Sequence, residues 1–157
     1  MVQEIPPPTI LLLDYQSLLF RPESIFARLQ NDEELHICHT VIETLTNLVQ
    51  KRDIYLENLA RRALVKIEEL KEHPKVVIQS EEQADLVYAF NHSVNEASNF
   101  EDKIIANFWF LLWTGGKPVK LVTLDGVIRS RAAREGVDLF DIQDLVGVEA
   151  LTVSSHD

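Results

Sequence analysis

The sequence predicts an α/β domain, a three-layer sandwich with helices on both faces of a central, mostly parallel sheet. Two observations support this fold class. Short, continuous apolar runs of the kind found in strands buried on both faces alternate with longer segments whose apolar residues recur every three or four positions. The 157 residues, 46% of them hydrophobic and 25% charged, suit one globular domain with a buried core. We expect this domain at residues 9–150, with flexible ends at 1–8 and 152–157.

The first half of the chain predicts three strands and three helices. The strands are expected at residues 9–13, 35–38 and 75–79, and the helices at residues 25–29, 41–49 and 54–72. Thr40 is a good N-cap, and Glu43 follows it at the spacing of a capping box. Pro74 ends the long third helix because proline cannot continue the helical hydrogen bonding.

The second half predicts the same alternation. We expect a helix at 81–91 capped by Ser80, a loop at 92–100, a helix at 101–113, a strand at 119–123, a helix at 128–135, a strand at 137–140 and a final turn at 142–145. Gly115 and Gly116 stop the helix at 101–113, and Gly136 closes the next one. The helix at 101–113 is apolar on most sides, so we expect it to be largely buried.

Several classes of protein are excluded by what the sequence lacks. Cys38 is the only cysteine, so the chain has no disulfide partner within itself and no cysteine-based zinc site. No apolar stretch reaches the roughly 18 residues that a membrane-spanning helix needs. The first residues carry no basic segment of the kind that opens a signal peptide. We therefore expect a cytoplasmic protein with no membrane partner.

The formal net charge of −10 argues against a nucleic-acid partner, because binding to phosphates normally needs a basic face. Two explanations of the acidic excess remain open. In the first, part of it forms a metal-binding cluster whose charge a cation offsets. Otherwise it is an ordinary solvated surface, which is the more common case.

Five acidic residues are candidates for a metal site. Asp14 and Asp125 each follow a predicted strand, and the carboxyl ends of parallel strands form one rim, where ligand sites lie. Glu43, Glu101 and Asp102 fall in the first turns of predicted helices. Carboxylates that converge at one point hold Mg²⁺ or Mn²⁺ ions, and such ions hydrolyse phosphodiesters by activating water and neutralising the leaving oxygen.

Each of these acids also has an ordinary structural interpretation. An acid in the first turn of a helix stabilises the helix dipole. Asp125 stands before Gly126, which is a common turn pair. Asp14 is the hardest to explain in this way, because a carboxylate directly after a buried strand is costly unless it is exposed or paired. The pattern alone leaves both interpretations open.

Five segments, in order along the chain, carry a resemblance to a known family. They are residues 11–26 with Asp14-Tyr-Gln and Pro22-Glu-Ser-Ile-Phe, 41–45 with Val-Ile-Glu-Thr-Leu, 58–63 with Asn-Leu-Ala-Arg-Arg-Ala, 100–106 with Phe-Glu-Asp-Lys-Ile-Ile-Ala, and 121–137 with Leu-Val-Thr-Leu-Asp. Together they resemble PIN domains, most closely those that precede PhoH-type ATPases. The resemblance covers nearly the whole chain. It implies a PIN-like fold and a Mg²⁺- or Mn²⁺-dependent ribonuclease that cuts single-stranded RNA.

The resemblance also assigns site residues. Asp14 and Asp125 match the metal-binding aspartates of the family. Glu101 stands where the family has an aspartate, and Asp102 beside it is a substitute. The glutamate of the family aligns with Thr44, while Glu43 lies one residue earlier, which is a helix rotation of about 100°.

Other positions near the expected site differ from the family as well. The family has Asp-Thr-Asn where this chain has Asp14-Tyr15-Gln16, so a hydroxyl beside the metal must come from Ser17 or Thr123. The longer side chain of a glutamate at position 101 moves its carboxylate by over ~1 Å, which disturbs a tight octahedral Mg²⁺ site.

Two basic stripes are candidates for contact with RNA. Arg61 and Arg62, followed by Lys66, lie on the predicted helix at 54–72, and in a PIN-like fold this stripe often faces the acidic groove. The second stripe follows Asp125 and consists of Arg129, Arg131 and Arg134. The ordinary interpretation is that these cations pair with nearby glutamates at i,i+4-type spacings.

Two functions from different classes follow. The first is a metal-dependent endoribonuclease with an altered acidic site, in which Asp14, Asp125, Glu101 and either Asp102 or Glu43 form the metal centre. The second is a catalytically weak or inactive PIN-like module that binds RNA or a protein partner, with a homodimer as one form. The altered residues after Asp14 and at Thr44 favour the second, and the acids that remain in register favour the first.

Overall fold

The computed structural model describes residues 7–30, 32–79 and 100–143, and within them the chain forms a four-stranded, all-parallel sheet. The strand order is β3-β2-β1-β4, and the strands are β1 (Thr9–Leu13), β2 (Glu33–Ile37), β3 (Val76–Ile78) and β4 (Val119–Val122). The register pairs Ile10 with Glu34 of β2 on one side of β1 and with Val119 of β4 on the other. The predicted α/β class with a mainly parallel sheet is confirmed.

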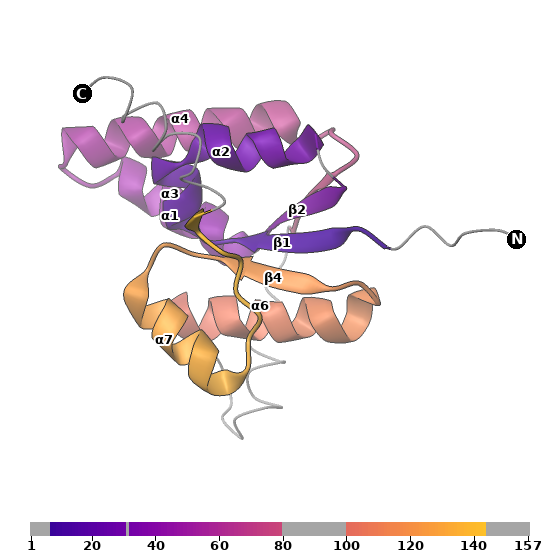
Figure 1. Cartoon of the computed structure of the whole chain (residues 1–157). Helices are drawn as coiled ribbons and strands as arrows, with labels where there is room; N and C mark the ends of the chain where they lie inside the picture. The colour runs from indigo at the N-terminus through magenta and orange to yellow at the C-terminus, as the bar shows by residue number, and fades with distance from the viewer. Residues whose placement is uncertain (1–6, 31, 80–99, 144–157) are drawn as a thin grey trace, which may run out of the picture.

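Helices cover both faces of this sheet (Figure 1). The helices are α1 (Tyr15–Phe20), α2 (Pro22–Ala27), α3 (His39–Val49), α4 (Ile54–Leu70), α6 (Phe100–Gly115) and α7 (Gly126–Glu135), with a short 3-10 helix at Arg28–Gln30. The helices α1 to α4 gather on one side, and α6 and α7 lie on the other (Figure 1). Three layers result, as predicted.

The central strand β1 lies at the middle of the core. Leu11, Leu12 and Leu13 are fully buried, which explains why this strand is a continuous apolar run rather than an alternating one. Phe108 of α6 is buried on the same core cluster as Leu45 of α3, so the helices of both layers pack onto the sheet. Burial of apolar area on both faces is what stabilises the sandwich.

The chain reverses its direction of travel across the sheet between β1 and β4. From β1 it proceeds outward to β2 and β3 through the helices of one layer, and it then returns to the other side of β1 through α6. Such a reversal leaves a crevice at the carboxyl ends of the two strands concerned, because the connections leave them toward opposite faces. The ends of β1 and β4 are therefore the favoured place for a site.

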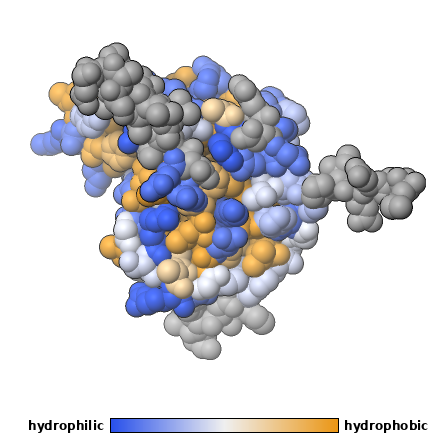
Figure 2. Space-filling view, in the orientation of Figure 1, coloured by the Kyte–Doolittle hydropathy of each residue, from blue (hydrophilic) through white to orange (hydrophobic). Residues whose placement is uncertain are grey.

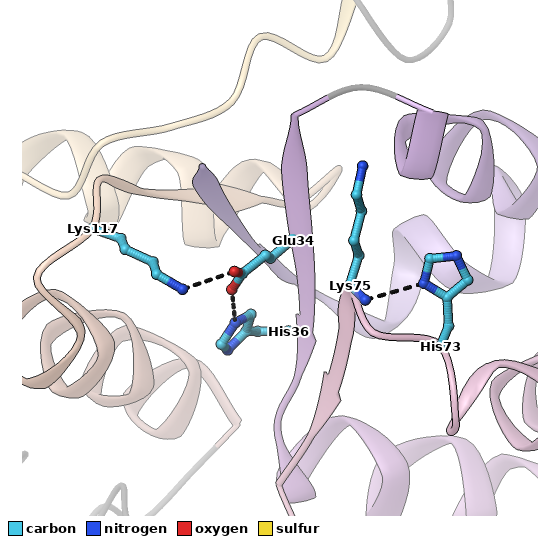
Figure 3. Close-up of polar contacts among 5 residues, drawn as sticks. All are labelled: Glu34, His36, His73, Lys75 and Lys117. Carbon is cyan, nitrogen blue, oxygen red and sulfur yellow. Dashed lines mark hydrogen bonds and ion pairs between the residues drawn. The ribbon is translucent and has the colours of Figure 1, made fainter. Parts of the chain in front are cut away.

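A polar cluster joins β2 to the residues that precede β4, at the end of the sheet opposite the crevice. Glu34 of β2 accepts a hydrogen bond from Lys117 Nζ at 2.7 Å and lies 3.3 Å from His36 Nε2 (Figure 3). Lys117 precedes β4, so this contact spans β1, which lies between the two strands. Burial, which outweighs the effect of Glu34, lowers the pKa of His36. On the other side of β2, the backbone N–H of Lys75 donates to His73 Nδ1 at 3.1 Å and shapes the entry to β3 (Figure 3).

Several local predictions are wrong. Helix α1 was not predicted, because its six residues are too few to show a helical period. The capping box at Thr40 does not form: α3 begins at His39 after the extended residue Cys38, and Thr40 is buried inside the first turn. The strand at 137–140 is reduced to a single parallel bridge between Leu139 and Leu121.

The buried character of α6 is also only partly as predicted. Its first three turns are mostly buried, but Leu112 and Trp113 are 36% and 51% exposed. The helix nevertheless ends where the two glycines indicated, and Gly116 has a φ of 63°. The predicted helix at 81–91, its cap Ser80 and nearly all of the loop at 92–100 lie outside the described residues, as does most of the turn at 142–145. No helix in the described ranges has both the length and the apolar composition to cross a membrane.

Candidate functional site

Asp14 lies at the carboxyl end of β1, in the crevice that the reversal of the chain creates. It is the N-cap of α1, and it is fully buried. Its Oδ1 accepts a hydrogen bond from the backbone N–H of Tyr15 at 2.6 Å, and its Oδ2 accepts one from Thr123 Oγ1 at 2.5 Å. Ser17 Oγ donates to the backbone carbonyl of Asp14 at 2.7 Å. Both carboxylate oxygens are therefore held in fixed directions.

Asp125 lies at the same rim, just after β4. It is the N-cap of α7, and its Oδ1 accepts hydrogen bonds from the backbone N–H groups of Val127 and Ile128 at 2.8 and 3.1 Å. Its Oδ2 faces the side chain of Gln16, whose Nε2 is 3.5 Å away, at the limit of a hydrogen bond. One oxygen thus stabilises the helix, and the other is only weakly engaged.

Thr123 connects the two aspartates. Its hydroxyl donates to Asp14 and accepts from the backbone N–H of Asp125 at 3.1 Å, so one side chain sets the position of both. The backbone carbonyl of Thr123 is in turn held by Arg129 Nη1 at 3.0 Å. Thr123 is fully buried, which keeps this arrangement out of bulk water.

The electrostatics of this pair favour a cation. The pKa of Asp14 is raised from 3.8 to about 6. Burial is the main cause and the negative charge of Asp125 adds to the rise, while the hydrogen bonds from Thr123 and Tyr15 oppose it. A buried carboxylate that is costly to ionise, with a second carboxylate close by, is a common arrangement at functional sites. A bound cation would remove this cost, because it interacts favourably with both charges.

Asp102, the third acid of the expected site, forms an ion pair with a neighbouring arginine. Asp102 in the first turn of α6 is 5% exposed, and its Oδ1 lies 2.5 Å from Arg131 Nη1. The Nε of the same arginine lies 2.6 Å from Glu135. The rings of Tyr15 and Phe100 meet edge to face at 5.1 Å, which places the start of α6 beside the start of α1. Asp102 is therefore near the rim, but its charge is balanced from within the chain.

Sequence reasoning did not anticipate this pairing. The sequence predicts Arg131 as part of a basic stripe that contacts RNA, or as a partner of a nearby glutamate such as Glu135. In the structure Arg131 forms ion pairs with both Glu135 and Asp102. The i,i+4 spacing from Arg131 to Glu135 was a usable signal. Nothing in the sequence spacing indicated Asp102, because that contact depends on how α6 and α7 pack.

The other acidic candidates lie at different places. Glu101 is half-buried in the first turn of α6. The side chain of Glu43 is 52% exposed and lies 3.3 Å from His39 Nε2, one helical turn earlier. Thr44 Oγ1 donates to the backbone carbonyl of Thr40 at 2.9 Å, which uses its hydroxyl within α3. The contacts of Glu43 and Thr44 thus remain within α3.

The basic candidates on α4 divide into two kinds. Arg61 lies along Glu57, with its Nη2 3.0 Å from the carboxylate, so it forms the i,i+4 pair that the ordinary interpretation predicted. Arg62 is exposed and lines a pocket between α1, α2 and α4. Arg62 is therefore better placed than Arg61 to contact a ligand.

The residues at the rim fit a single divalent ion. No group of three or more histidine, cysteine or acidic side chains that could hold a metal is found among residues 7–30, 32–79 and 100–143. Mg²⁺ is often bound by only one or two carboxylates, with water and substrate phosphate completing the shell. Asp14 and Asp125, oriented by Thr123, supply that smaller set.

Comparison with known proteins identifies a family for this chain. A family model described as PIN domain matches residues 11–143, which is more than half of the chain and includes both rim aspartates. A search of curated proteins finds no match.

Proposed function

The chain belongs to the PIN domain family, whose members are in general metal-dependent nucleases, and from this membership we propose that it is an endoribonuclease acting on single-stranded RNA. The observation that carries the proposal is the buried Asp14, which shares Thr123 with Asp125 at the carboxyl ends of β1 and β4. We propose the domain at residues 9–150 as the working unit. We also propose that, within the family, the chain is most similar to the PIN domains that precede PhoH-type ATPases.

We assign the roles at the site from the contacts of each side chain. Asp14 and Asp125 would hold one Mg²⁺ or Mn²⁺ ion, and the bound ion would activate water and stabilise the charge that develops on the phosphate. Thr123 fixes the direction of both carboxylates. Gln16 Nε2 lies beside Asp125 Oδ2 and makes a weak contact with it. Glu101, half-buried at the start of α6, is the remaining acid that would complete the shell through water.

The paired acid has a different role in this proposal. Asp102 with Arg131 holds α6 against α7, and it thereby keeps the start of α6 at the rim. Because Arg131, which Asp102 shares with Glu135, offsets part of the charge of Asp102, the rim carries less uncompensated negative charge when it receives an RNA phosphate. Arg62 on α4 is our choice for a contact with the RNA backbone, because no hydrogen bond or ion pair engages it within the part of the chain that the structure describes.

One specific observation favours a second function. The pairing of Asp102 with Arg131 leaves two rim carboxylates where a nuclease site commonly has three or more. The alternative is a module of the same fold that binds RNA or a protein without cutting it. The net charge of −10 points in the same direction, because it weakens contact with phosphates.

Cleavage of a labelled single-stranded RNA in Mn²⁺ tests the proposal. The wild type is compared with Asp14→Asn, with Asp125→Asn and with Asp53→Asn, which changes the exposed N-cap of α4 and leaves the rim intact. Asparagine caps a helix about as well as aspartate, so Asp125→Asn and Asp53→Asn keep their helices. We expect cleavage that needs the metal, survives Asp53→Asn and is lost in both rim variants.

The other outcomes decide between the two functions. Folded wild-type protein that leaves RNA intact in Mn²⁺ would refute the nuclease and favour the binding module. Activity that persists in both rim variants would place the chemistry elsewhere or in a contaminant. Cleavage of single-stranded DNA at the same rate as RNA would keep the nuclease and remove the preference for RNA.

A further inference from the structure

A pocket of about 530 Å³ opens between α1, α2 and α4, away from the acidic rim. Its floor is apolar and includes the buried residues Leu18, Leu19 and Ala63. Two aromatic side chains at its edge are exposed, Phe20 by 41% and Tyr55 by 66%. Pockets of this size and composition are typical of small-ligand sites.

Basic side chains lie at the mouth of the pocket, although the chain as a whole is strongly acidic. Arg62 and Lys66, one helical turn apart on α4, line the pocket together with Glu23 of α2. Lys66 Nζ lies 5.9 Å from the ring centroid of Phe26 and 3.6 Å from Glu69. Arg62 has no ion pair within the described residues. A free guanidinium beside an apolar floor in a chain of net charge −10 is complementary to an anionic ligand with a flat apolar part.

The pocket is joined to the acidic rim by one short helix. Asp14 is the N-cap of α1, whereas Leu18, Leu19 and Phe20 at the other end of α1 line the pocket. At about 1.5 Å of rise per residue, these positions are about 6–9 Å apart along the helix. Neighbouring nucleotides of a strand are about 3.4 Å apart when stacked, so two or three stacked nucleotides, or fewer extended ones, cover this separation.

Figure 2 shows hydrophobic residues at the surface around the end of the molecule where α3 leads into α4. Tyr55 and its neighbour Ile54, which is 75% exposed, begin α4 at this end. Exposed aromatic side chains next to unpaired cations are how proteins hold single-stranded nucleic acids, because every base has a face that stacks and every nucleotide carries a phosphate.

From these observations we infer that the pocket between α1, α2 and α4 is a nucleotide subsite, which takes an unstacked base of a single-stranded RNA between Phe20 and Tyr55 and its phosphate on Arg62. This inference rests on the proposed function, because it places the base within three nucleotides of the phosphate at Asp14 and Asp125. The subsite would set the register of the strand on the rim. It would also supply the affinity that the acidic rim lacks.

Binding in the absence of cleavage tests the subsite. The full chain carrying Asp125→Asn is titrated, by fluorescence anisotropy in EDTA, with a labelled hexauridylate and with copies in which one position at a time is abasic. We expect the abasic change to weaken binding by about tenfold at one position and to have little effect at the others, since stacking of one base contributes this much. Adding Tyr55→Ala should weaken binding of the unmodified strand. It should also make all of the abasic copies bind with similar affinity.

Matched variants distinguish RNA binding in the pocket from RNA binding to the surface around it. Ile54→Ala changes the exposed neighbour of Tyr55 that does not line the pocket, and it should leave the position dependence intact. Arg62→Ala should reduce the slope of log affinity against log salt by about one, as expected for one lost phosphate contact. Arg61→Ala, which removes a cation already paired with Glu57, should change that slope less.

The outcomes distinguish this inference from the proposed function. A scan with no position dependence, or equal effects of Tyr55→Ala and Ile54→Ala, would overturn the subsite and leave the pocket to another occupant such as an apolar peptide. If the wild type cleaves RNA in Mn²⁺ while the scan is flat, the nuclease stands and the subsite fails. If the scan is position-dependent but the wild type does not cleave, the subsite stands and the nuclease fails.

Discussion

Replacing the buried rim aspartate should make the metal-free protein more stable. The pKa of Asp14 is raised from 3.8 to about 6, with burial as the main cause. The folded state therefore binds a proton on Asp14 more tightly than the unfolded state does. Protonated Asp14 therefore stabilises the fold. This contribution is fully present below about pH 4 and is lost as the pH rises through about 6, so that ionised Asp14 destabilises the fold at neutral pH.

The expected magnitude follows from these two values. The difference between 3.8 and about 6 corresponds to about 3 kcal/mol of unfolding free energy at pH 7. Asparagine keeps the acceptor for the N–H of Tyr15 and carries no charge, and its amide can donate to the hydroxyl of Thr123 once that hydroxyl rotates. We expect Asp14→Asn to raise the free energy of unfolding by about 1–3 kcal/mol at pH 7 and by little at pH 4.

Urea denaturation in EDTA at pH 7 and at pH 4 measures this difference. The control is Asp53→Asn, which makes the same chemical change at an exposed N-cap, where Asp53 Oδ1 accepts from Tyr55 and Leu56. This control should stay within about 0.5 kcal/mol of the wild type at both pH values. The reasoning would be refuted if Asp14→Asn were destabilising at pH 7, or if its gain were the same at both pH values.

Three further outcomes are expected. Mn²⁺ at about 100 times its Kd should stabilise the wild type by about 2.7 kcal/mol and leave Asp14→Asn unchanged in a thermal melt, and equal shifts would place the ion elsewhere. Arg131→Met should cost about 3–5 kcal/mol in urea denaturation, because it removes the cation that is paired with the buried Asp102. Arg134→Met, on the exposed side of α7, should cost under about 0.5 kcal/mol. Gly136→Ala should destabilise by about 1 kcal/mol or more in the same assay, because the φ of 78° at this C-cap is unfavourable for any residue with a Cβ, and a neutral result would mean that the end of α7 relaxes.

The sheet and the two rim aspartates were predictable from the sequence for one physical reason. Strands buried on both faces are continuous apolar runs, and the runs that end at Asp14 and before Asp125 are the neighbouring strands β1 and β4, which lie on either side of the chain reversal. Parallel strands bring their carboxyl ends to one rim, so residues far apart in the sequence become neighbours. Local pattern and global topology agree at these positions.

The details of the site depended on packing, which a sequence pattern does not encode. Arg131 reaches Asp102 only because α6 and α7 lie side by side on one face of the sheet. Helix α3 begins at His39, two residues before the predicted start, because Cys38 is its extended N-cap residue, and Thr40 is buried in its first turn. The pocket between α1, α2 and α4 could not be predicted either, because α1 is too short to show a helical period.

The double engagement of Asp125 has an evolutionary consequence. One of its oxygens caps α7, while the other faces the rim, so the same residue serves folding and the site. A mutation to asparagine would keep the cap and remove the charge. If the proposed nuclease function holds, such a lineage would lose catalysis in one step, with no selection against it from misfolding. The fact that a related protein folds well is therefore weak evidence that it is active. The residue at position 125 has to be identified directly before activity is inferred.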